Sequence, residues 1–223
     1  MGRRQQSRGK CMFCGREFTR GGLSRHLPAC HERQAEIEKA DSGPGRTETL
    51  VHLMVQDAYG GDYWLHLEMR GSATLKALDN YLRSIWLECC GHLSRFSVGG
   101  WGSKEISMGK KVENVLASGV ELTHIYDFGT SSNTLIKGIR ARKGKPLTEN
   151  PIVLMARNNA PEFTCSECGE PAAWVCMECS EWEDVLLCQA HADEHEHDDY
   201  LMPLVNSPRT GMCGYWGPAE PPY

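Results

Sequence analysis

Hydrophobic and polar positions between residues 48 and 145 follow the periods of strands at both ends and of a helix in the middle. The apolar run LVHLMV at 50–55 predicts a buried strand. After a Gly60-Gly61 turn, the apolar residues of 63–69 occupy alternate positions, which predicts a second strand paired with the first in a hairpin. Segments 121–128 and 134–142 show the same strand character around a polar turn and predict a second strand pair.

A helix is expected between these two strand pairs. Apolar residues recur at helical spacing over 72–86, with Ser72 or Thr74 as the candidate cap. A short strand over 95–98 and a short helix over 111–117 complete the pattern. The sequence therefore predicts an α+β domain, with one helix packed across a mostly antiparallel sheet.

Composition divides the chain into five segments. Residues 1–10 predict a flexible basic arm, 11–31 a zinc finger, and 32–47 a connector that contains the structure-breaking DSGPG stretch at 41–45. Residues 48–157 form the α+β domain. Residues 162–217 form a module with two zinc sites and a C-terminal tail. Two small zinc-stabilised modules are thus expected to flank the central domain.

The C-terminal module is predicted from eight metal ligands within 33 residues. Two CxxC pairs and a CxxH pair are followed by two histidines, which is enough for two tetrahedral zinc sites. The predicted ligands are Cys165, Cys168, Cys176, Cys179, Cys188, His191, His195 and His197. Trp174 and Trp182 are the large residues expected in its small core.

Two pairings of these eight ligands are open. Sequential pairing gives the first four ligands to one ion and the last four to the other. Cross-braced pairing joins the first and third pairs and leaves the second pair to His195 and His197, as in the B-box-type modules that the order of ligands resembles. The cross-brace is favoured because interleaved sites tie a short chain into one unit. Cys213 is the competitor of His195 or His197 for the eighth position.

The N-terminal segment resembles a ββα zinc finger. Cys11, Cys14, His26 and Cys30 have the spacing of its ligands, and Phe18 and Leu23 would supply its core. Proline at position 28 interrupts the ligand-bearing helix, so the helix should kink or end near Leu27. Together with the C-terminal module, the finger brings the expected number of zinc ions to three.

The central segment is similar to the Ri-plasmid Orf-three-like family, which includes passenger proteins of insertion elements. The resemblance covers about residues 48–145 and rests on WLECCGHLSRF at 86–96 and IYDFG at 125–129. The ending NSPRTGMCGYWG at 206–217 also looks like an extended form of this family. The resemblance implies a compact α+β domain of β-grasp-like type and no established chemistry.

Charge is distributed unevenly along the chain, although its formal total is only −5. Residues 1–33 hold eight Lys or Arg and two acids, whereas residues 162–199 hold twelve acids and no Lys or Arg. Such asymmetry indicates different partners at the two ends. Arginine binds phosphate and guanine edges in a bidentate manner, so Arg16, Arg20 and Arg25 are the candidate nucleic-acid contacts.

We therefore expect a non-enzymatic zinc protein. Its finger would contact an RNA or DNA backbone non-specifically, and its acidic module would contact a protein. The alternative is a protein–protein adaptor that binds no nucleic acid. The CxxC spacing and the absence of a secretory signal or an apolar membrane-spanning run favour the cytoplasm. No small-molecule substrate is indicated.

A thiol-dependent enzyme is the third expectation. Cys89, Cys90 and His92 could form a nucleophile pair, but a buried structural thiol with His92 capping the helix is favoured. A metal site at these three residues lacks a fourth ligand nearby in the sequence.

Overall fold

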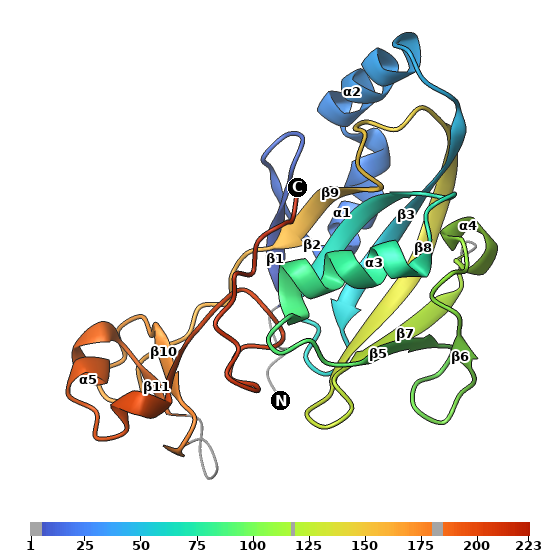
Figure 1. The fold of residues 1–223 in the computed structure, drawn as a ribbon. Helices are drawn as coiled ribbons and strands as arrows, with labels where there is room; N and C mark the ends of the chain where they lie inside the picture. The colour runs from blue at the N-terminus through green and yellow to red at the C-terminus, as the bar shows by residue number, and fades with distance from the viewer. Residues whose placement is uncertain (1–5, 117–118, 180–184) are drawn as a thin grey trace.

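The computed structural model describes residues 6–116, 119–179 and 185–223. Over these residues, nine strands form one antiparallel sheet in the order β2-β1-β9-β4-β3-β8-β7-β5-β6 (Figure 1). The strands are β1 (Arg8–Cys11), β2 (Glu17–Thr19), β3 (Glu48–Asp57), β4 (Trp64–Arg70), β5 (Ser94–Ser97), β6 (Glu105–Ile106), β7 (Glu121–Tyr126), β8 (Ser132–Gly144) and β9 (Ile152–Asn158). The helices around the sheet are α1 (Arg20–His26), η1 (Leu27–Ala29), α2 (His31–Ser42), α3 (Leu75–Leu82), η2 (Arg83–Leu87) and α4 (Val112–Val115).

Both predicted strand pairs are confirmed. Strands β3 and β4 pair with Leu53 opposite Leu67, and β7 and β8 pair with Leu122 opposite Ile136. The predicted helix is α3, which begins after Thr74 and continues into the π-helical turn η2. The apolar residues of its stripe are all fully buried: Leu75, Leu78, Leu82, Ile85 and Trp86. The short helix expected over 111–117 is α4; Ala117 lies outside the described residues.

The β-grasp-like expectation is wrong in its topology. A β-grasp sheet has a parallel pair of strands at its centre, whereas the neighbouring strands β3 and β8 pair antiparallel over ten residue pairs. Every other pairing between described strands of this sheet is also antiparallel. The α+β class holds, but the sheet is a larger antiparallel structure.

The finger extends this sheet and is not a separate module. Strand β1 pairs with β2 inside the finger and with β9 on its other side, so residues 8–10 are in a strand and not in a flexible arm. A Cβ atom on Gly9 would lie 2.0 Å from the Arg157 carbonyl oxygen, which is why this position needs glycine. Strand β9, which the hydrophobic pattern missed, joins the finger to β4. The rest of the expected arm, residues 1–5, lies outside the described residues.

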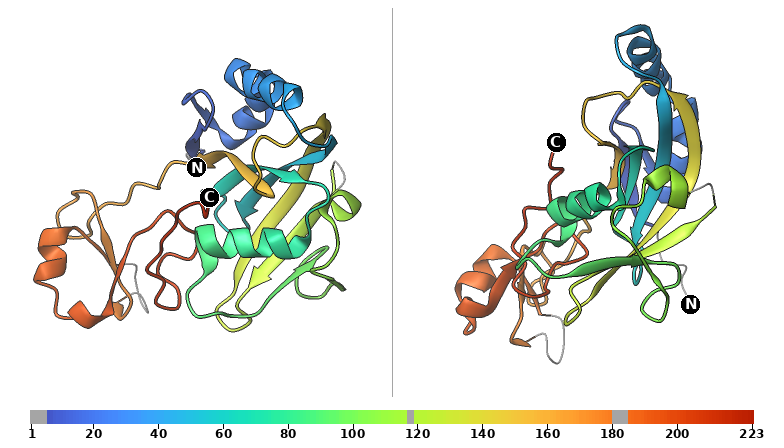
Figure 2. Two further views of the ribbon diagram at one scale, coloured as in Figure 1. Left: turned by 45° about the horizontal axis from the view of Figure 1, so that its top comes forward. Right: turned by 45° about the vertical axis from the view of Figure 1, so that its right-hand side comes forward.

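Opposite faces of β4 contact different layers. Leu65, Leu67 and Met69 belong to the main core, which α3 covers. On the other face, Trp64 packs against the finger, and the carboxylate of Glu68 accepts from Arg33 of α2 at 2.6 Å. The finger and α2 therefore lie across the sheet from α3 (Figure 2). Helix α2 covers most of the segment expected to be a connector.

The C-terminal module stands beside the sheet (Figures 1 and 2). It contains β10 (Trp174–Cys176), β11 (Leu186–Leu187), α5 (Gln189–Asp193), η4 (Asp198–Tyr200) and β12 (Leu201–Pro203). Its small core includes Leu187 and Ala192, with Trp174 packed against them; Trp182 lies outside the described residues. The tail after β12 runs back to the central domain, where Arg209 and Tyr215 are buried. In the described part of the chain, no helix combines the length and apolar character needed to cross a bilayer.

Candidate metal centres

A tetrahedral zinc ion fixes the distances between its ligand atoms. With Zn–S bonds of about 2.3 Å and Zn–N bonds of about 2.0 Å, two sulfurs lie about 3.8 Å apart, and a sulfur and a nitrogen about 3.5 Å apart. Among the described residues, four groups of Cys and His place their ligand atoms within 4.8 Å of one another. All eleven cysteines of the chain are free thiols and belong to these groups. Each group could therefore hold a metal ion.

The finger group contains the four predicted ligands. Cys11 Sγ lies 3.9 Å from Cys30 Sγ, and Cys14 Sγ lies 3.3 Å from His26 Nε2. Helix α1 begins after Thr19, whose hydroxyl accepts from the backbone N–H of Gly22. As the proline predicts, α1 ends at His26, and a 3-10 turn over Leu27–Ala29 carries the chain to Cys30.

The C-terminal ligands are grouped as the cross-braced pairing requires. Cys165 and Cys168 are grouped with Cys188 and His191, the third pair along the chain. Within this group the sulfurs of Cys168 and Cys188 lie 3.8 Å apart, and Cys165 Sγ lies 3.5 Å from His191 Nδ1. Burial alone would raise the pKa of Cys165, but backbone N–H groups around its sulfur lower it to about 6. A readily formed thiolate favours metal binding, since the ligand form of cysteine is deprotonated.

The second site of the module uses the remaining pair and the two histidines. Cys179 Sγ lies 3.6 Å from His195 Nε2 and 3.3 Å from His197 Nδ1, while Cys176 Sγ lies 3.9 Å from the same His197 nitrogen. Both histidines therefore occupy ligand positions, and Cys213 does not replace either of them.

Cys213 belongs instead to a fourth group, with Cys89, Cys90 and His92. Cys213 was expected only as a competitor for a position in the C-terminal module, because it lies 121 residues away from His92 in the sequence. The expected packing of one thiol in the core holds for Cys89, which is partly buried against the main core, whereas Cys90 is exposed. His92 Nε2 lies 3.3 Å from Cys213 Sγ.

The three predicted nucleic-acid contacts differ in their surroundings. Arg25 is exposed in the last turn of α1. Arg16 is exposed but hydrogen-bonds to Cys14, and this interaction is the main cause of the raised pKa of Arg16. Arg20 is half-buried and donates to the Gly61 carbonyl at 3.2 Å. Arg25 is thus the one with the most open surroundings of the three.

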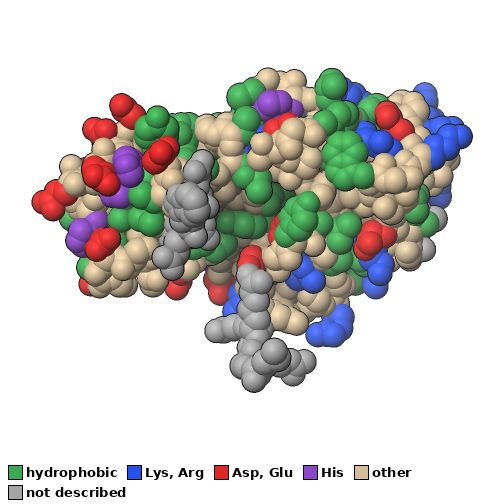
Figure 3. All heavy atoms as spheres, turned by 90° about the horizontal axis from the view of Figure 1, so that it is seen from below, with side chains coloured by type: hydrophobic (Ala, Val, Ile, Leu, Met, Phe, Trp, Pro, Cys, Tyr) green, Lys and Arg blue, Asp and Glu red, His purple; other side chains and the backbone are tan. Residues whose placement is uncertain are grey.

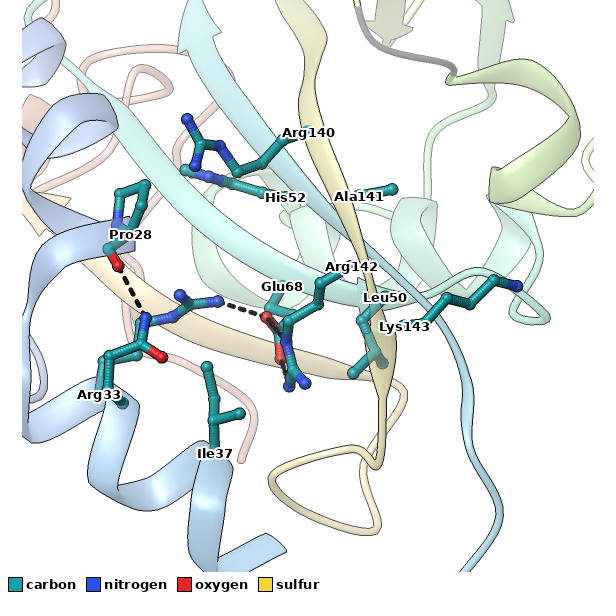
Figure 4. A pocket seen from close by; sticks show the side chains of 11 residues that line it. Pro28, Arg33, Ile37, Leu50, His52, Glu68, Arg140, Ala141, Arg142 and Lys143 are labelled. Atoms are coloured by element: carbon teal, nitrogen blue, oxygen red, sulfur yellow. Dashed lines mark hydrogen bonds and ion pairs between the residues drawn. The ribbon is translucent and has the colours of Figure 1, made fainter. Parts of the chain in front are cut away.

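A more basic site lies where the finger side meets the sheet. A pocket of about 300 Å³, here called the junction pocket, opens between α2 and β8 (Figure 4). Its lining includes four cationic side chains and a single carboxylate: Arg33, Arg140, Arg142, Lys143 and Glu68. Glu68 is buried and already accepts from Arg33 and from Arg142, so it does not neutralise the other two cations.

The junction pocket also has buried donors to spare. Among the described residues, Arg33 Nε and Arg142 Nη1 are buried and have no hydrogen-bond partner. His52 adds no charge of its own: burial, followed by the charges of His66, Arg33 and Arg140, lowers the pKa of His52 to about 3. The pocket therefore has an excess of positive charge, a property of an anion site.

The opposite charge gathers around the C-terminal module, where Asp, Glu and His side chains crowd one end of the molecule (Figure 3). A hollow of about 590 Å³, here called the acidic groove, lies between α5, η4 and the tail. Trp174 and Trp216 line it with their rings 6.3 Å apart, edge to face, and the groove has no Lys or Arg. Its carboxylates come from Asp193, Asp198 and Asp199.

Comparison with known proteins adds little to this geometry. No family model and no curated protein matches the chain. A crystal structure of a protein of unknown function from Methanosarcina mazei Go1 aligns with 55% of this chain and 75% of its own, at 16% identity and a TM-score of 0.40. The resemblance to the Ri-plasmid Orf-three-like family therefore stays a prediction.

Proposed function

We propose that the chain is a non-enzymatic, zinc-organised protein that contacts nucleic-acid phosphates through its finger side and a basic protein segment through its acidic module. Zinc is favoured by ligand sets of two or three cysteines completed by histidine. Four protein ligands close each predicted site, whereas catalytic zinc keeps a position open for water or substrate. This supports a structural role for the metal and places function on the surfaces that it holds in position.

The junction pocket carries the nucleic-acid part of the proposal. Phosphate oxygens accept hydrogen bonds and bear negative charge, which matches the exposed cationic side chains of Arg140 and Lys143 at the pocket. The packing of Leu23 and Leu27 against Trp64 argues against base reading by α1, because it fixes this helix against the sheet. Contact with the backbone, in RNA or DNA, is the mode that these side chains support.

Salt dependence tests this part. We expect the zinc-loaded full chain to bind a short labelled RNA or DNA duplex, with affinity falling steeply as salt rises. Arg140→Ala/Lys143→Ala should weaken binding and reduce the log–log salt slope by about 1.8, since each duplex phosphate contact contributes about 0.9. Arg25→Ala should act in the same direction, by about half as much. Fluorescence anisotropy at several salt concentrations measures both quantities.

The matched control is Lys104→Ala/Lys110→Ala, which removes the same charge from exposed positions near β6, the sheet edge opposite the finger. It should leave the slope near that of the unmodified chain. Equal effects of the two double variants would show that only net charge matters, and the junction pocket would lose its role.

The acidic groove carries the protein-binding part. Lys and Arg side chains are attracted both to aspartates and to the faces of tryptophan rings. Trp216 is 59% exposed, so its ring is open to such a side chain. The groove therefore suits a basic segment of a partner protein and repels phosphates.

A labelled peptide rich in Lys and Arg should bind the full chain, and Trp216→Ala should weaken that binding about 2- to 30-fold, the equivalent of ~0.5–2 kcal/mol for a cation–π contact. Trp101→Ala is the control, because Trp101 is similarly exposed but lies beside Phe128, outside the module. If Trp216→Ala bound the peptide as tightly as the unmodified chain, the acidic groove would not be the binding site. Peptide binding without duplex binding would establish the adaptor alternative.

A further inference from the structure

The fourth Cys/His group joins two distant parts of the chain. Cys89 and Cys90 directly follow η2 and Glu88, and His92 precedes β5, all on the central domain. Cys213 comes from the tail that returns from the C-terminal module. Their four ligand atoms lie within 4.8 Å of one another, as in the three predicted sites. His92 Nε2 and Cys213 Sγ are separated by 3.3 Å, close to the sulfur–nitrogen distance on tetrahedral zinc.

We propose that Cys89, Cys90, His92 and Cys213 bind a fourth zinc ion, which fastens the C-terminal tail to the central domain. Three cysteines and one histidine form a ligand set that selects zinc and closes its coordination. The inference goes beyond the proposed function, which needs only the three sites predicted from the sequence.

The tail is held firmly on the N-terminal side of Cys213. The guanidinium of Arg209 is fully buried and donates to Asp127 Oδ2 at 2.7 Å and to the Thr130 carbonyl at 2.6 Å. Ser207 Oγ donates to the Trp86 carbonyl at 2.5 Å, at the end of the central helix. These contacts bring Cys213 to the other three ligands.

The backbone of Cys213 has an unusual conformation. Its φ of 50° lies in the left-handed region, which residues with a Cβ atom rarely adopt. Gly211 and Gly214 on either side have φ values of 74° and 62°. A tight turn built by glycines thus contains one cysteine in an unfavourable conformation, with its sulfur next to His92. Unfavourable backbone conformations of this kind gather at ligand-binding sites.

The surroundings of Cys89 suit a metal-bound thiolate. Arg209 Nη2 donates to Cys89 Sγ at 3.5 Å, and the sulfur lies 3.9 Å from the Tyr126 hydroxyl. A zinc ion with three thiolates and a neutral imidazole has a net charge of −1, and it would lie beside the Arg209 guanidinium, which also pairs with Asp127. Groups that hydrogen-bond to metal ligands orient them and tune the site. Arg209 would do this while also anchoring the tail.

Native mass spectrometry of the full chain, purified in reducing buffer without chelator, tests the proposal. We expect four zinc ions per chain, and three in both Cys213→Ser and His92→Ala. The control His31→Ala changes an exposed histidine outside the four groups and should keep four. Three ions in the unmodified chain, or four in both ligand variants, would overturn the proposal. If the denatured mass under non-reducing conditions were lower by two hydrogens, the cysteines would form a disulfide, and the proposed zinc site would be wrong.

Hydrogen exchange tests the fastening separately. Cys213→Ser should accelerate amide exchange over residues 207–215 and leave the finger amides unchanged, because the central ligands remain but the tail loses its link. Unchanged exchange in the tail would refute the structural role even if an ion is lost. Cobalt substitution gives an independent readout, since thiolate-to-cobalt absorption should fall by about one site of four in the variant. Duplex and peptide binding test the proposed function, so its failure can be told apart from failure of this site.

Discussion

Cys179→Ser should unfold the whole C-terminal module, including the metal site to which Cys179 does not belong. The two sites share their chain segments, because the ligands of one alternate in pairs with those of the other. Structural zinc in finger peptides has an apparent binding free energy of about 10–16 kcal/mol, which exceeds the 5–15 kcal/mol that stabilises a typical whole domain. The described core of the module has few buried apolar residues and does not offset the loss of an ion.

Native mass spectrometry should therefore show the loss of two zinc ions from this variant, with fast amide exchange across residues 165–203. The neighbouring change Glu178→Ser, at an exposed position that supplies no ligand, should retain both ions. Loss of only one ion, with slow exchange preserved around the other, would mean that each site is stable without the other.

Cys30→Ser should destabilise the central sheet as well as the finger. Leu23 and Leu27 are fully buried against Trp64 and Met155, and they stay in position only while the zinc holds the finger helix. Loss of one buried leucine side chain costs about 2–5 kcal/mol. Displacement of two should lower the free energy of unfolding by at least that amount. Urea unfolding followed by tryptophan fluorescence, with Trp64 as a reporter at the junction, measures the change.

Met12→Ala is the matched control, because Met12 belongs to the same finger loop but is 55% exposed and is not a ligand. It should change the unfolding free energy little. If Cys30→Ser released the finger zinc while the free energy of unfolding stayed the same, the finger would not stabilise the sheet, despite its pairing with β9.

What the sequence predicted depends on how local each signal is. The alternation around Leu65 and Leu67 and the stripe from Leu75 to Trp86 lie within single elements, so both were found. The metal ligands of the finger and the module were found for the same reason, since the two members of each pair are separated by one to three residues. The proline at position 28 marked the end of α1 through its own backbone chemistry.

The features that were missed join residues far apart in the chain. Pairing of β1 with β9 places Gly9 opposite Asn158, and no local pattern contains such a register. The alternation along β4 does not indicate what its second face contacts, and Glu68 on that face is buried because Arg33 and Arg142 neutralise it. Cys213 likewise joins Cys89, Cys90 and His92 only through the path of the tail. The sequence thus predicted elements and sites better than their neighbours in space.

The pairing of β1 with β9 imposes an order on synthesis. Ribosomes add about 5–20 residues per second, so Asn158, the partner of Gly9, is added ~6–25 s after the end of the finger at residue 31. During this interval the finger, with its four predicted ligands between residues 11 and 30, is complete and able to take up zinc, but Leu23 and Leu27 lack Met155 and Ala156, two of the residues that cover them. A nascent chain therefore exposes an apolar, metal-loaded finger until the last strand of the sheet arrives, and that interval is when chaperones have access to it.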